Sequence, residues 1–298
     1  MALVTVLSAK GAPGATTTAM LLASLWPRPT VLVDADPSGG DIALRLPRQD
    51  GRPLDPQRGL LSLLPSARRG VPPELIHDHT QTALGGQPVL AGLSGPEQSS
   101  AVGPLWGALA DAFARLPGPD VVVDAGQVHA HSPHLALVDR SDLVLWVYRP
   151  TAWSALHTRR RLEGLADHFA DSPTRVIAVP VASPDQRGDV AAASATILGD
   201  WTWVTGSAPV ALDPKAVVMF EGGEVFRPER TLLARSGRVL ADALYAELAP
   251  SRAGADVRDR GPDDSTGSED RGPDDSAEVV PVGAAGGKRR RLRGRRSA

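Results

Sequence analysis

The stretch SAKGAPGATTTA, residues 8–19, holds one lysine, two glycines and three threonines directly after an apolar segment. The backbone N–H groups of a Gly-rich turn that leads into a helix form a binding site for an anion such as phosphate. In a loop of the form G-x-x-x-x-G-K-[ST], a lysine then lies between two phosphates and a hydroxyl meets Mg²⁺. Thr16 keeps that hydroxyl, but Ala15 stands where the lysine belongs, and the nearest lysine is Lys10. The alternative is an ordinary turn between a strand and a helix that binds nothing.

Lysine is rare in this chain, which makes the position of Lys10 informative. Only three of the 32 Lys/Arg residues are lysines, namely Lys10, Lys215 and Lys288. Because a lysine in any given loop is improbable at this frequency, we expect Lys10 to have a role.

Three aspartates follow apolar segments in the same way as the Gly-rich stretch does. Asp34 and Asp36 end the segment TVLVDAD (30–36), and Asp124 lies near the end of DVVVDAG (120–126). In open α/β sheets, ligands bind beyond the carboxyl ends of the strands. Strand-end acids also cap the following helix in many proteins. Three of them beside a Gly-rich turn favour a binding site.

Apolar runs that alternate with helical patterns must position these residues. Strands are predicted at 2–7, 30–36, 88–92, 120–126, 142–148, 175–181 and within 201–212. Helices are predicted at 16–26, 60–64, 98–116, 132–140, 151–169, 188–199 and 229–248. Strands that are apolar throughout predict an α/β fold, with a predominantly parallel sheet and helices on both faces.

The chain divides at about residue 250. Residues 1–250 are expected to form one domain, whereas 251–298 are rich in Pro, Gly, Ser and Asp and are expected to be disordered. This tail is acidic first and then basic, ending in KRRRLRGRR (288–296), with seven positive charges in nine residues. It is expected either to contact anionic lipid or nucleic acid electrostatically or to act only as a solubilising tail.

The Gly-rich stretch resembles the deviant Walker A loop of the MinD/ParA family of P-loop ATPases, whose members read roughly K-G-G-x-G-K-[ST]-T. The matching residues are Lys10, Gly11, Gly14, Thr16 and Thr17, while Ala12 and Ala15 depart from the pattern. The resemblance extends over most of 1–250. VLVDADPSGGD (31–41) is similar to the D-x-D-P segment, and DVVVDAG is similar to the Walker B strand. Residues 141–165 and 207–226 resemble later segments of the family.

This resemblance implies that the chain binds ATP and Mg²⁺. The implied nucleotide-binding residues are Lys10, Gly11, Ala12, Pro13, Gly14, Ala15, Thr16 and Thr17. Thr16 and, through water, Asp124 would hold the metal, and Asp34 would lie near it. Lys10 and Asp36 would be catalytic, with Lys10 reaching the nucleotide of the partner in a homodimer and Asp36 orienting the attacking water.

The missing loop lysine indicates a degenerate member of that family. One charged hydrogen bond contributes about 1.5–3 kcal/mol, so nucleotide binding is expected to weaken by about 10- to 100-fold. Removing a donor to the transition state costs on the order of 10²–10³ in rate. We therefore expect weak binding with a slow or inactive ATPase. The alternative is complete loss of nucleotide binding, with only the fold retained.

Within the family, a degenerate Walker A loop such as this one resembles those of TadZ/CpaE-type proteins. The resemblance therefore implies a spatial organiser that recruits a protein partner of a pilus, secretion or localisation system. A first alternative is a ParA-type protein that partitions a chromosome or plasmid and binds DNA non-specifically. Residues 1–250 hold 21 Lys/Arg and 25 Asp/Glu, which disfavours DNA binding by the body. A second alternative is a metabolic enzyme of the same superfold, such as a cysteine-free ligase.

Three further features narrow the class of protein. The chain has no cysteine, which excludes thiolate chemistry and fits a reducing cytosol. No apolar run approaches the roughly 18 residues that a transmembrane helix needs, so the expected location is cytoplasmic or peripheral at the membrane. His129, His131 and His134 could ligate zinc, but their spacing fits no structural zinc site and a solvated loop is favoured.

Overall fold

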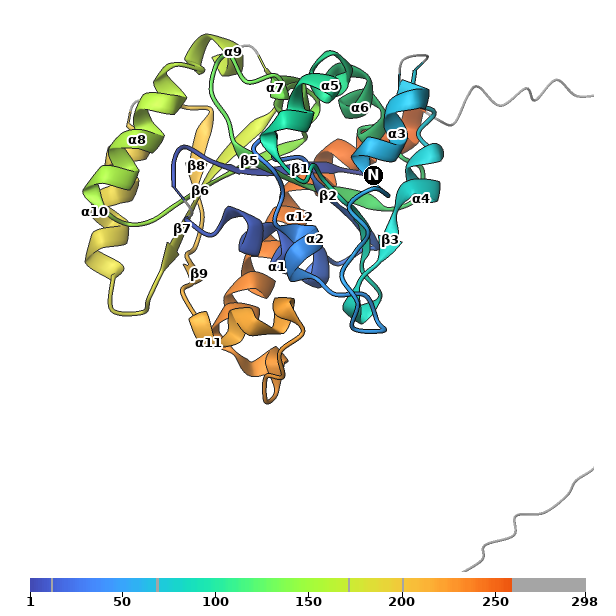
Figure 1. The fold of residues 1–298 in the computed structure, drawn as a ribbon. Coiled ribbons are helices and arrows are strands. Elements are labelled where there is room, and N and C mark those ends of the chain that lie inside the picture. The colour runs from blue at the N-terminus through green and yellow to red at the C-terminus, as the bar shows by residue number, and fades with distance from the viewer. Residues whose placement is uncertain (12, 68–69, 171, 200, 259–298) are drawn as a thin grey trace, which may run out of the picture. The chain divides into compact units, whose positions relative to one another are not determined.

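A computed structural model describes residues 1–258 except 12, 68–69, 171 and 200 (Figure 1). Residues Met1–Val257 form one compact unit. The last helix, α12 (Leu232–Arg258), continues beyond the domain boundary predicted at residue 250. The remainder of the predicted tail, 259–298, lies outside the described residues.

A central sheet runs through the compact unit with the order β3-β4-β2-β5-β1-β6-β7-β8, and β9 also pairs with β7. All pairings are parallel except that of β3 with β4, which confirms the predicted sheet. The strands are β1 (Leu3–Ser8), β2 (Thr30–Asp34), β3 (Gln81–Thr82), β4 (Pro88–Leu90), β5 (Asp120–Gln127), β6 (Leu143–Tyr148), β7 (Arg175–Ala182), β8 (Val204–Gly206) and β9 (Val210–Ala211).

Helices cover both faces of the sheet, because successive residues of each buried strand point to opposite sides. Val4 and Val6 pack into one core cluster, while Leu3 and Leu7 pack into the other. The first cluster is covered by α1 (Ala15–Leu25), α2 (Ile42–Arg45), α11 (Pro214–Val217) and α12. The second is covered by α3 (Leu60–Ala67), α4 (Leu75–His79), α5 (Ser99–Val102), α6 (Trp106–Phe113), α7 (Leu135–Arg140), α8 (Ala152–Glu163), α9 (Ala166–Ala170) and α10 (Arg187–Leu198).

Several elements differ from the prediction. The helix expected over 151–169 is divided into α8 and α9. Gly164 keeps helical backbone angles, but the Leu165 N–H donates to the Leu162 carbonyl three residues back, which interrupts the α-helical hydrogen-bond pattern. The short elements α2, α4, α11 and β3 were not expected. None of the described helices is both long and apolar enough to span a bilayer.

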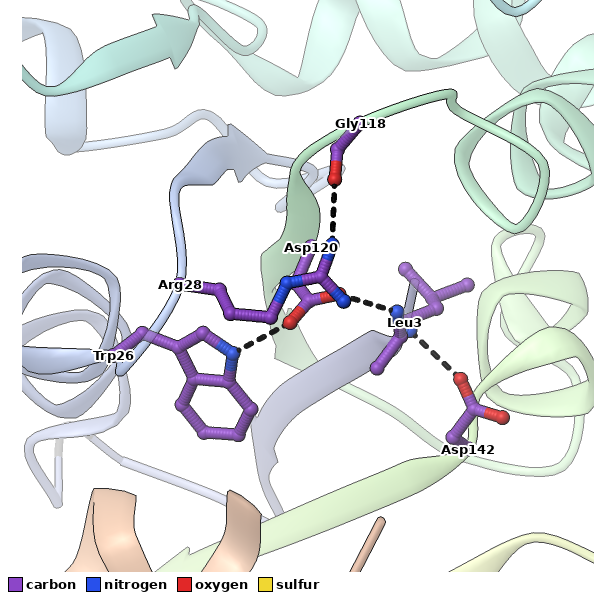
Figure 2. Close-up of polar contacts among 7 residues, drawn as sticks. Leu3, Trp26, Arg28, Gly118, Asp120 and Asp142 are labelled. Carbon is purple, nitrogen blue, oxygen red and sulfur yellow. Dashed lines mark hydrogen bonds and ion pairs between the residues drawn. The ribbon is translucent and has the colours of Figure 1, made fainter. Parts of the chain in front are cut away.

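Two aspartates fix the amino ends of the central strands (Figure 2). Asp120, at the start of β5, is fully buried and accepts hydrogen bonds from the Ala2 N–H at 2.7 Å and the Trp26 indole N–H at 2.9 Å. The Arg28 guanidinium lies 3.7 Å from the same carboxylate. Asp142 accepts a hydrogen bond from the Leu3 N–H at 2.8 Å. These acids hold β1 between its neighbours, so their role is structural.

Candidate functional site

The Gly-rich loop connects β1 to α1 in the predicted way. Gly11 and Gly14 have φ values of 73° and 107°, in the left-handed region that favours glycine. A Cβ on Gly14 would meet only the methyl groups of Val181 at 3.7 and 3.8 Å, so the backbone conformation rather than space requires glycine here. No described side chain caps the amino end of α1, and the first N–H groups of this helix therefore remain available to an anion. Ala12 lies outside the described residues.

A cavity of about 300 Å³ opens at this helix end. It brings together six of the predicted loop residues, Gly11, Pro13, Gly14, Ala15, Thr16 and Thr17, with Asp36. Ser8, Asp41, Arg45, Gly126, Gln127 and Arg149 complete its lining. Lys10 is exposed and does not line the cavity.

Asp34 and Asp124 face each other in the register of β2 and β5. Asp34 is completely buried and accepts hydrogen bonds from the Ile42 N–H at 3.1 Å and the Asp36 N–H at 3.5 Å. Burial, and secondly the charge of Asp124, raise the pKa of Asp34 well above its usual value. No described residue forms an ion pair with either carboxylate.

Space around Asp34 is tight. A Cβ on Gly40 would overlap both carboxylate oxygens, and a Cβ on Gly92 would lie 2.7 Å from Cγ. Neither glycine has a positive φ, so close approach to Asp34 is the reason for glycine at both positions. Two loops therefore enclose this carboxylate.

Asp124 connects the acids to the Gly-rich loop. The Thr16 hydroxyl and the Gly126 N–H, the latter at 3.2 Å, hydrogen-bond to its carboxylate. Burial nevertheless raises the pKa of Asp124 to about 6, and the charges of Asp36 and Asp41 act in the same direction. At neutral pH an ionised Asp124 thus lies buried, with no cation beside it from any residue that the structure describes, an arrangement that a bound metal ion would stabilise.

Asp36 is partly exposed at the edge of the cavity. Burial raises its pKa, while hydrogen bonds from Ser38, including one from the backbone N–H at 2.8 Å, act in the opposite direction. Gly126 makes room for it, since a Cβ there would overlap the Asp36 carboxylate.

Thr16, Asp34 and Asp124 fit Mg²⁺ only in part. Among the described residues, no three His, Cys, Asp or Glu side chains converge on one point. Mg²⁺ usually binds through one or two carboxylates, substrate phosphates and water, so a complete protein cage is not required. Two buried carboxylates and a hydroxyl, all oxygen donors, match that chemistry.

The solvated loop favoured for the three histidines is wrong for one of them. His129 and His131 are exposed, but His134 is completely buried and its Nε2 lies 3.0 Å from the Ala125 carbonyl oxygen. Burial lowers the pKa of His134 to about 4.

The sequence reasoning missed two arginines that line the cavity. The Arg45 guanidinium donates to the Thr17 hydroxyl at 3.3 and 3.4 Å and lies 3.6 Å from the Glu221 carboxylate. Arg149 directly follows β6, and burial lowers the pKa of its guanidinium. The sequence alone does not mark Arg149, because its proximity to the Gly-rich loop follows from the pairing of β1 with β6.

The sequence matches no family model and no curated protein. Solved structures are nevertheless similar. A ParA family ATPase from Chlorobium tepidum superposes with a TM-score of 0.65 at 16% identity, over 80% of this chain and 97% of the other. The MinC:MinD cell division protein complex of Aquifex aeolicus gives a TM-score of 0.59 at 19% identity, over 82% and 96%.

A cobyrinic acid a,c-diamide synthase from Mycobacterium smegmatis, with bound ATP analog and magnesium, gives a TM-score of 0.61 at 17% identity, over 82% and 94%. At such identities the similarity establishes the fold. This chain therefore has the P-loop fold of MinD- and ParA-type ATPases, built around a mostly parallel sheet.

Proposed function

We propose that the chain binds ATP with Mg²⁺ at the amino end of α1 and hydrolyses it slowly or not at all. The observation that carries this proposal is the uncapped amino end of α1 next to two buried acids that have no cationic partner in the described part of the chain. The first N–H groups of α1 would bind phosphate oxygens. Thr16, Asp34 and Asp124 would hold Mg²⁺, which supplies positive charge to both the acids and the phosphates.

Similar folds support the choice of ligand. The synthase from Mycobacterium smegmatis contains an ATP analog and magnesium, and a MinD protein from Pyrococcus horikoshii is complexed with Mg-ADP. These ligands belong to those proteins. For this chain they indicate which nucleotide to test first.

Slow turnover follows from the composition of the cavity. Ala15 provides no charge to a transferring phosphoryl group, and losing one such donor costs on the order of 10²–10³ in rate. Asp36, at the cavity edge, would orient a water, and Lys10, outside the cavity, would act on the nucleotide of a partner subunit in a homodimer. Nucleotide would then serve to control dimerisation rather than to drive rapid cycling.

The cellular role that we propose is a spatial organiser that recruits a protein partner of pilus or secretion machinery from the cytoplasm or the membrane surface. The MinC:MinD complex supports recruitment of a protein partner by a protein of this fold. A fluorescent fusion of the full chain should form localised foci that become diffuse in the Thr16→Ala variant. Foci that are unchanged in Thr16→Ala would argue against nucleotide control of recruitment.

The second candidate is a ParA-type partition protein, which the similarity to the Chlorobium tepidum ATPase favours. The two roles differ in DNA binding. ATP-dependent retention on non-specific DNA at physiological salt would support partitioning, whereas salt-sensitive retention that needs only residues 251–298 would not.

Calorimetric titration of the full chain with Mg-ATP tests nucleotide binding. Binding is expected for the wild type and for Thr196→Ala, because Thr196 is exposed and its hydroxyl bonds only to its own helix, at the Ala192 carbonyl. Thr16→Ala should lose the Mg²⁺-dependent part of the affinity. Phosphate release measured in parallel gives the rate of turnover. Absence of heat at millimolar Mg-ATP, together with an unchanged melting temperature, would refute the proposal.

A further inference from the structure

Four aspartates lie at or near the cavity at the amino end of α1. Asp36 and Asp41 line it, and the buried Asp34 and Asp124 lie behind it. A triphosphate adds further negative charge, and Mg²⁺ neutralises only part of the total. Since Ala15 is uncharged and Lys10 lies outside the cavity, a positive group must come from elsewhere.

Among the described residues, two arginines line the cavity, and one of them is already engaged. Arg45 bonds to the Thr17 hydroxyl and lies beside the Glu221 carboxylate. Its side chain is 21% exposed. Arg45 therefore fixes Thr17 at the start of α1, and its charge is shared with an acid.

Arg149 is placed differently. Ser8 at the end of β1 pairs with Val147 of β6, so Arg149 lies just beyond the point where the Gly-rich loop begins. Its backbone N–H donates to the Ser154 hydroxyl at 3.1 Å, which fixes the main chain at the start of α8. Its guanidinium has no hydrogen-bond or ion-pair partner among the described residues. It is half-buried, and burial lowers its pKa. Even so, a guanidinium stays charged at neutral pH, so an anion bound beside it would offset the cost of burial.

We propose that Arg149 supplies, within one subunit, the phosphate-binding positive charge that Ala15 lacks. This inference rests on the proposed binding of a nucleotide in the cavity. A planar guanidinium can hold two phosphate oxygens at once, and it approaches from the end of β6 rather than from the loop. Binding by a single subunit then does not need Lys10 of a partner.

The test is Mg-ATP titration of the full chain. Arg149→Ala should weaken binding about 10- to 100-fold, the effect of one charged hydrogen bond. Arg149→Lys should recover part of the loss, because it keeps the charge but not the paired donors. Arg160→Ala is the matched control, since Arg160 is exposed on α8 and does not line the cavity. It should bind like the wild type. Arg149→Gln replaces Arg149→Ala in the test if the alanine variant does not fold.

A second variant asks whether Arg149 replaces the loop lysine. Adding Ala15→Lys to the Arg149→Ala variant should restore most of the lost affinity, because either cation would serve the same phosphates. The same comparison in a Lys10→Ala background removes any contribution from a partner subunit, and the effect of Arg149→Ala should persist there.

The outcomes separate this inference from the proposed function. If the wild type does not bind Mg-ATP, the proposed function fails and the inference fails with it. If the wild type binds and folded Arg149→Ala binds equally well, only the role of Arg149 is overturned. If Arg149→Ala binds weakly and Ala15→Lys restores nothing, Arg149 does not replace the lysine.

Discussion

Asp34 and Asp124 lie opposite each other at the carboxyl ends of β2 and β5, and both are buried. At the other end of β5, the equally buried Asp120 is paired with Arg28 and two N–H donors. The same strand therefore carries one acid neutralised by the protein and one without a cation among the described residues. This difference supports the proposal that Asp124 holds a ligand, whereas the role of Asp120 is structural.

Asp124→Asn should stabilise the ligand-free protein at neutral pH. The pKa of Asp124 is about 6 in the folded chain against 3.8 for a free carboxyl group, so folding favours the protonated form. The contribution of this group to stability is thus complete below about pH 4 and is lost as the pH rises through 6, by on the order of 3 kcal/mol. Urea unfolding at pH 4 and pH 7.5 should show the variant gaining on the wild type at the higher pH.

Asp120→Asn is the matched control, and its effect should have the opposite sign. Arg28 and the Trp26 indole N–H would lose the charged carboxylate that they contact, which is expected to lower the free energy of unfolding by about 1–3 kcal/mol at pH 7.5. For Asp124→Asn, the free energy of unfolding should differ from that of the wild type by different amounts at pH 4 and pH 7.5. The same difference at both pH values would contradict an ionised, unpaired Asp124.

Gly40→Ala should damage the site by displacing Asp34. The added methyl group would overlap both oxygens of the Asp34 carboxylate. A loss of about 1–3 kcal/mol in the free energy of unfolding is expected, along with weaker Mg-ATP binding. Thermal unfolding and titration measure the two effects. Gly107→Ala is the control. Gly107 lies inside α6, and an added Cβ would meet nothing within 4 Å, so the free energy of unfolding should rise or stay unchanged.

The sheet could be predicted from sequence because each central strand is an apolar run long enough to be buried on both faces. LVTVLS, TVLVD and LVLWVY form β1, β2 and β6 within one or two residues of the expected bounds. The prediction of one long helix over 151–169 was wrong in one respect, because the sequence pattern did not reveal the break between α8 and α9. Short elements such as α2 and β3 depend on tertiary contacts and have no periodicity of their own.

The site was predictable where one local motif carries it, and less so where distant segments meet. The Gly-rich loop and the acids at strand ends were identified from residue type and from the end of the sheet that they share. Gly40 and Gly92 were not, since only the position of Asp34 in space explains them. Arg149 was missed for the same reason: its proximity to the loop follows from the pairing of β1 with β6.

Lys10→Ala should separate binding from assembly. Lys10 is exposed and lies outside the cavity, so the variant should bind Mg-ATP as a single subunit with affinity within about threefold of the wild type. It should fail to form the Mg-ATP-dependent dimer that we propose for the wild type. Sedimentation velocity with and without Mg-ATP measures this, and Lys10→Arg should keep part of the dimer. A wild type that stays monomeric at saturating Mg-ATP would exclude the role of Lys10 in a partner's site.

His134 should give the opposite pH dependence to Asp124. Its pKa is about 4 in the folded chain against 6.5 for a free imidazole, because burial disfavours the charged ring. Its contribution to stability is therefore present above pH 6.5 and is lost as the pH falls towards 4, by on the order of 3 kcal/mol. His134→Gln keeps a donor for the Ala125 carbonyl but does not titrate, so the wild type should lose stability relative to this variant between pH 6.5 and 4.

Because Asp124 acts with the reverse sign over nearly the same range, the wild type alone would show little net change of stability with pH from the two groups. Urea unfolding of the two single variants across this range resolves them, and a His134→Gln curve parallel to the wild type would show that the ring is charged in the fold.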